Sequence, residues 1–90
     1  MKKAVITVIG NDTVGIIAKV SNKCFDFNAN ILDITQKVFS DTFCMIMMID
    51  ISNINSDFDT FVDELEKLGK EMGLAIRTMH EDIFNSMHRI

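Results

Sequence analysis

The sequence predicts an α+β sandwich in the order β-α-β-β-α-β, with a four-stranded antiparallel sheet and both main helices on one face. Two segments carry apolar residues at helical spacing and four carry strand patterning. The ninety residues suffice for one domain, residues 1–90, with a core of modest size. Right-handed crossovers then place the strands in the order 4-1-3-2 across the sheet. We expect helices over 14–27 and 57–72 and strands over 3–10, 30–40, 42–52 and 74–81.

The strand patterns predict different depths of burial. The run AVITVI is rich in Val and Ile, so the first strand is expected to be buried on both faces or nearly so. Residues 30–40 alternate, with Leu32, Ile34, Gln36 and Val38 on one face, which favours an edge strand. The run FCMIMMI is too apolar for an edge and is expected to be central.

The two helical segments have recognisable ends. In the first, the apolar face is formed by Ile17, Val20, Cys24 and Phe27, and Asn28 follows where a left-handed residue would end the helix. Gly73 is the expected stop of the second.

The C-terminal segment is expected to form a short amphipathic tail helix. Ile83, Phe84 and Met87 are three large apolar residues within five positions, so they should pack on the sheet or on a partner. Both main helices cover one face of the sheet, while the strands carry apolar residues on both. The other face must therefore be covered by the tail, by a second subunit, or by both, and we expect a homodimer or higher oligomer.

Composition excludes several classes of function. The net charge is −4 and the Lys and Arg residues form no stripe, which argues against direct binding of nucleic acid. No apolar run approaches the ~20 residues of a membrane span, and the start of the chain does not resemble a signal peptide. A cytoplasmic location without membrane contact is expected. Cys24 and Cys44 form no C-x-x-C motif and are expected to be reduced, buried thiols.

The stretch Gly-Asn-Asp-Thr-Val-Gly, residues 10–15, joins the first strand to the first helix. One interpretation is structural, with Asp12 or Thr13 capping the helix and Gly10 permitting the turn. The other is a ligand cradle, in which Gly10 and Gly15 let a ligand approach the backbone and the helix amides bind its carboxylate. Spacing alone leaves both interpretations open.

The stretch D-x-x-G-I-I-A-x-V-S and the second-strand pattern N-I-x-D-I-x-Q resemble an ACT domain, a small regulatory module that binds amino acids. With FVDELEKLGKEMGLAI, the resemblance covers almost the whole chain, and the ending HEDIFNSMHRI resembles small stand-alone ACT proteins similar to glycine-cleavage regulatory proteins. The resemblance implies a ferredoxin-like fold and a non-enzymatic regulatory function, with no cofactor. It also implies a small amino acid or related metabolite bound at a subunit interface. Matching positions are Asn11, Asp12, Val14, Gly15, Ile16 and Asn30, where Val14 replaces the usual Pro or small residue.

Other functions on this scaffold lack their required residues. Acylphosphatase would need an Arg in the first loop and an Asn on the third strand, and the sequence has neither. A metal-carrying domain would need a C-x-x-C motif in the first loop, and the sequence has none. An RNA-recognition domain would need aromatic residues on its strands to stack on bases, and the third strand has only Phe43. His80 and His88 lack a nearby nucleophile in sequence, so no catalytic or metal-binding residue is assigned. A ligand-free association module remains the alternative.

Overall fold

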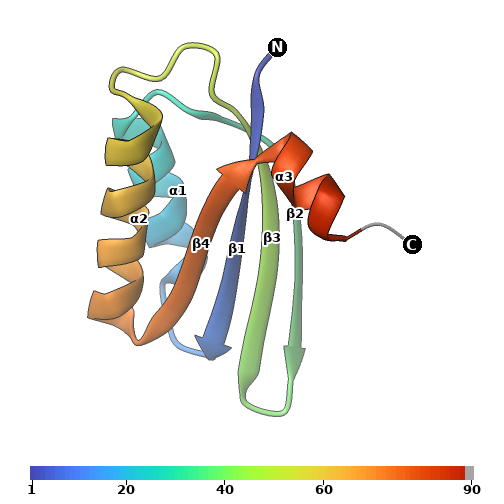
Figure 1. Cartoon of the computed structure of the whole chain (residues 1–90). Helices are drawn as coiled ribbons and strands as arrows, with labels where there is room; N and C mark the ends of the chain where they lie inside the picture. Colours follow the sequence, from blue (N-terminus) through green and yellow to red (C-terminus); the bar gives the residue numbers. More distant parts are fainter. Residues whose placement is uncertain (89–90) are drawn as a thin grey trace.

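The computed structural model describes residues 1–88 as a two-layer sandwich, with α1 and α2 together on one face of an antiparallel sheet (Figure 1). The sheet has the strand order β2-β3-β1-β4. A third short helix, α3, lies on the opposite face. The elements are β1 (Lys3–Asn11), α1 (Ile16–Asp26), β2 (Asn30–Phe39), β3 (Thr42–Asp50), α2 (Phe58–Met72), β4 (Leu74–His80) and α3 (Glu81–Met87).

The predicted element order, strand order and two-layer architecture are confirmed. β3 is central, because it pairs with β1 on one side and with β2 on the other. Most element ends agree within a residue or two. The start of α1 differs in a way that matters, because Val14 and Gly15 form a turn and the helix begins only at Ile16.

The core lies between the two main helices and the sheet, where apolar side chains of alternate strand positions meet the inner helix faces. Residues 6 and 8 of β1 face residues 47 and 45 of β3 across the ladder, and all four are buried. In α1, Val20 and Cys24 are buried as predicted, together with Ile16, whereas Ile17 and the C-cap residue Phe27 are only half-buried. In α2, Phe61 and Leu65 are buried. This packing fixes the position of α1 above β2 and of α2 above β4.

The other face of the sheet is only half covered. Val5 is fully buried there because α3 lies over its end of β1, whereas Ile9, four residues further along, is 54% exposed. The prediction that the first strand is buried on both faces is therefore correct for the half of β1 around Val5 and wrong for the half around Ile9. In the tail, Phe84 is half-buried, but Ile83 is 52% and Met87 65% exposed, so the single chain leaves these two mainly in solvent.

β2 is an edge strand, as predicted, but its alternation contains a β-bulge. The register shifts between Ile31 and Asp33, so that Leu32 is the extra residue. Beyond the bulge, Ile34 and Val38 lie opposite buried Met47 and Phe43, and therefore face the helix layer. The sequence pattern placed Leu32 on the same face without this interruption, because a single inserted residue does not show in a period-2 count.

Asn28 ends the first helix in the left-handed conformation, with φ of 60°. Its side-chain amide donates a 2.9 Å hydrogen bond to the carbonyl of Asn53. We predict that Asn28→Gly changes stability by less than about 1 kcal/mol, since relief of the left-handed backbone offsets the lost bond. Asn28→Val should cost roughly 1–2 kcal/mol more, because a β-branched residue is strained at positive φ. Equal melting temperatures of the two variants would contradict this account.

The two free thiols differ in environment, contrary to the expectation that both are buried. Cys24 is buried in the core and Cys44 is half-buried on the opposite sheet face. Burial raises the pKa of the Cys24 thiol to about 11. Because an unfolded chain would ionise this thiol near pH 9.0, we predict that its contribution to stability is lost as pH rises from 9.0 towards 11.

Thiol titration with an aromatic disulfide reagent checks this difference. At pH 8 the folded protein should expose one reactive thiol, Cys44, and the second should react only on unfolding. Cys44→Ser should therefore show no fast reaction in the folded state. A fast thiol in that variant would mean that Cys24 is accessible.

Candidate functional site

The loop between β1 and α1 presents an uncapped helix N-terminus. Gly15 is the N-cap residue, with φ of 89°, and the backbone N–H of Lys19 donates a 2.9 Å bond to its carbonyl. Within residues 1–88, no side chain caps the helix, and its first turn contains no acidic residue. The structure thus contradicts the interpretation that Asp12 or Thr13 caps α1. The first-turn amides carry the positive end of the helix dipole and lack a side-chain acceptor.

The loop is held at one point and is otherwise open. The backbone N–H of Asp12 donates a 2.8 Å bond to the carbonyl of Asp41, which ties the loop to the turn between β2 and β3. The side chains of Asn11, Asp12 and Val14 are all exposed, and Val14 reaches 96%. The carboxylate of Asp12 is therefore available beside the helix N-terminus.

The two glycines of the loop have different functions. A Cβ at Gly10 would lie 2.6 Å from Cδ2 of Leu74, so Gly10 permits close packing of β1 against β4 and does not open a ligand approach. This corrects the prediction for Gly10. A Cβ at Gly15 would meet nothing within 4 Å, and only its positive φ demands glycine. A side chain at position 15 would project into the open space at the helix end.

The remaining predicted site residues lie in different places. Ile16 is 2% exposed, so its side chain belongs to the core and only its backbone N–H faces the loop. Asn30 opens β2 opposite Asp50, at the far end of the sheet. The loop lies beside the other end of β2, where Phe39 pairs with Thr42. At about 3.3 Å per residue the two ends of β2 are roughly 30 Å apart, so one chain does not bring Asn30 to the loop.

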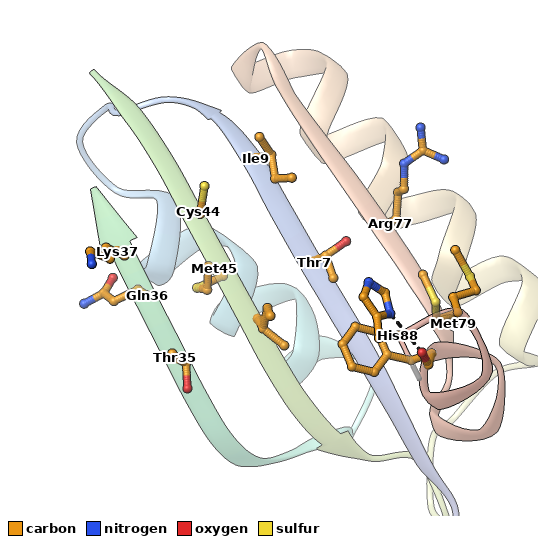
Figure 2. A pocket seen from close by; sticks show the side chains of 13 residues that line it. Thr7, Ile9, Thr35, Gln36, Lys37, Cys44, Met45, Arg77, Met79 and His88 are labelled. Carbon is orange, nitrogen blue, oxygen red and sulfur yellow. Dashed lines mark hydrogen bonds between the residues drawn. The ribbon is translucent and has the colours of Figure 1, made fainter. Parts of the chain in front are cut away.

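A groove on the open sheet face was not predicted. Its volume is about 410 Å³. Figure 2 shows the side chains that line it between the sheet and α3. Its floor is formed by β1 and β3, with Ile9 and Ile46 exposed. Its wall is formed by Phe84 of α3 and by His88, the residue that follows the helix. The sequence did signal that the strands are apolar on both faces. It could not show that α3 covers only one end.

The histidines and acidic groups form no recognisable reaction centre. The ring of His80 stacks on that of Phe58, with 4.1 Å between the ring centroids. The ring of His88 stacks on that of Phe84, with 4.2 Å between the centroids. Within residues 1–88, no three His, Cys, Asp or Glu side chains are grouped so that they could hold a metal ion. In the same part of the chain, no helix has the length and apolar character needed to cross a membrane.

Comparison with known proteins agrees with the fold. A family model described as ACT domain matches residues 2–79. A UPF0237 protein from Methanocaldococcus jannaschii is 50% identical over 90 residues, which is 100% of both chains. An ACT domain protein from Streptococcus pneumoniae is 36% identical with a TM-score of 0.80, covering 92% of this chain and 93% of that one.

A more distant similarity concerns a crystal structure described as a putative glycine cleavage system transcriptional repressor. It is 26% identical with a TM-score of 0.72, covering 88% of this chain and 45% of that one. This agrees with the resemblance to glycine-cleavage regulatory proteins seen in the sequence. From the family match over most of its length and the shared fold, this chain belongs to the ACT domain family.

Proposed function

We propose that the chain is a regulatory module that binds a small amino acid or a related metabolite between two subunits. The observation that carries this proposal is the uncapped N-terminus of α1 behind the left-handed Gly15. Amides at a helix N-terminus are suited to a carboxylate, and the exposed carboxylate of Asp12 is suited to an ammonium group. ACT domains are regulatory ligand-binding modules, and the similarity to a putative glycine-cleavage repressor supports an amino acid as the ligand.

The size of the ligand depends on fewer residues than the sequence suggested. Ile16 turns into the core, so it places no limit on a ligand side chain. Val14, which is 96% exposed, is the apolar residue next to the helix end. Small amino acids such as glycine and serine therefore remain the first candidate ligands. The main reason is the similarity to the putative glycine-cleavage repressor, because the loop itself places little steric limit on the ligand.

A second copy of the chain supplies the residue that one chain lacks. If two β2 edges pair antiparallel about a two-fold axis near the middle of the strand, Asn30 of each copy comes beside Phe39 of the other. That end of β2 adjoins the loop, because Asp12 is bonded to Asp41. Two equivalent sites would then form, each with the loop of one subunit and Asn30 of its partner.

The flank beside β2 has the composition of such an interface. Phe25 of α1 is 82% exposed, and Val14, in the turn just before the other end of the helix, is 96% exposed. This side of α1 faces away from α2, since Lys23 on the opposite side contacts Glu64 at 3.8 Å. Val38, on the helix face of β2, is also exposed. An exposed apolar flank along an unpaired edge strand favours association with another chain.

This flank also favours the alternative function, a ligand-free association module. Such a module would need β2 and α1 for pairing, but it would have no use for an open helix N-terminus. The two functions are separated by whether the loop binds a ligand when the oligomer is intact.

We predict that Asp12→Ala and Asn30→Ala each weaken binding of the amino acid by more than they weaken folding. Each would remove a charge-assisted hydrogen bond worth about 1.5–3 kcal/mol, or roughly ten-fold to over a hundred-fold in affinity. Gly15→Val should abolish binding, because its side chain would occupy the approach to the helix end. Calorimetric titration of the twenty amino acids against the wild type and these variants is the measurement.

Asp63→Ala is the matched control, since Asp63 is an exposed acid on α2, away from the loop. It should bind as the wild type does. Absence of heat across the whole panel, with the oligomer intact, would contradict the ligand-binding function and leave the association module.

We predict that Phe25→Lys separates the subunits, because it places a charge on a large exposed apolar residue at one end of the proposed apolar flank. Ile83→Lys makes the same kind of change at an exposed apolar residue of α3 and should leave the subunit count unchanged. Native mass spectrometry reports the subunit count and any retained ligand together. Dissociation by Ile83→Lys alone would place the interface at α3 instead of at β2.

A further inference from the structure

The groove between α3 and the open sheet face has the dimensions of a small-molecule site. Its volume of about 410 Å³ falls within the roughly 300–1,000 Å³ typical of ligand pockets. The groove lies on the face opposite α1 and α2, whereas the loop site lies at the sheet end where α1 begins. It therefore plays no part in the function proposed above.

The floor of the groove exposes apolar side chains in the middle of the sheet. Ile9 of β1 is 54% exposed and Ile46 of β3 is 45% exposed, although both belong to central strands. Thr7 lies directly opposite Ile46 in the ladder, and the side chains of Phe84 and Met87 border the same space. A patch of this kind away from any sheet edge favours contact with an apolar molecule.

The charged side chains that line the groove are positive. Arg77 of β4 and Lys37 of β2 lie on opposite sides, and no Asp or Glu is among the described residues that line the space. The chain as a whole has thirteen acidic and nine basic residues, so this part of the surface departs from its average. Nζ of Lys37 lies 4.7 Å from the ring centroid of Phe39, while Arg77 makes no ion pair within residues 1–88. The guanidinium of Arg77 is thus available to an anion.

The shape of the groove favours a short ligand over a second copy of the chain. α3 rises above the sheet at one end, so another flat sheet face could not lie evenly against this one (Figure 1). A molecule of small cross-section could lie beside α3 on the exposed floor. We propose that this groove binds an apolar carboxylate, whose hydrocarbon part covers Ile9 and Ile46 and whose carboxylate interacts with Arg77.

Octanoate is a suitable probe, with octylamine as the matched compound of the same chain length and opposite charge. In amide NMR spectra of the isotope-labelled protein, millimolar octanoate should shift the resonances of Thr7, Ile9 and Ile46 and leave those of residues 12–16 in place. Octylamine should bind at least several-fold more weakly. Equal binding of the two compounds, or shifts confined to residues 12–16, would overturn the proposal.

Two variants locate the binding. Arg77→Gln should weaken octanoate binding by about fivefold or more. Lys19→Gln removes the same charge from an exposed position on α1 and should have no effect on binding. Ile46→Glu places a carboxylate on the floor and should abolish binding. If Ile46→Glu lowers the subunit count seen in native mass spectrometry, a second copy covers the groove and the proposal is wrong. Arg77 is exposed, so its substitution remains informative even if the Ile46 variant fails to fold.

Discussion

The antiparallel pairing of β1 with both β3 and β4 determines where the core, the open sheet face and the loop before α1 lie. One face of this strand supplies buried core residues to the helix layer, and the other supplies Val5 under α3 and Ile9 in the groove. Its last residues determine where the chain emerges before α1. Gly10 lets Leu74 approach β1 closely, and the bond from Asp12 to Asp41 then fixes the loop beside the β2–β3 turn. The position of the helix N-terminus is therefore set by sheet register.

The elements of residues 1–88 cover the open face of the sheet only in part. A ninety-residue domain buries only about 60% of the surface that its unfolded chain exposes. Two helices suffice for one face, and α3, with seven residues, covers only one end of the other. The far half must either meet solvent or receive another molecule. The apolar groove beside α3 and the apolar flank beside β2 are two separate consequences of this limit.

The fold was predictable because its signals are local and repeated. Period 2 marks β2, period 3.6 marks the two main helices, and continuous apolar runs mark β1 and β3. Asn28 is left-handed as predicted, and Gly73, the predicted stop of α2, is left-handed as well. The predictions that were wrong concern features that depend on contacts between residues far apart in the sequence. Gly10 looked like a ligand-approach glycine because its neighbour Leu74 is 64 residues away, and the bulge at Leu32 exists only in the pairing with β3. Ile16 matched the family pattern by position, yet only the three-dimensional packing shows that its side chain enters the core.

The separation of Asn30 from the loop gives a physical reason for a site shared between subunits. A ligand that contacts the loop of one copy and Asn30 of another must bind the dimer more tightly than the monomer. By linkage, it must then stabilise the dimer in proportion to that difference in affinity. Occupancy and association become two aspects of one equilibrium. The proposed dimer would need no large internal movement to report its ligand, because a change in subunit contact would expose or cover the apolar flank of α1 and β2.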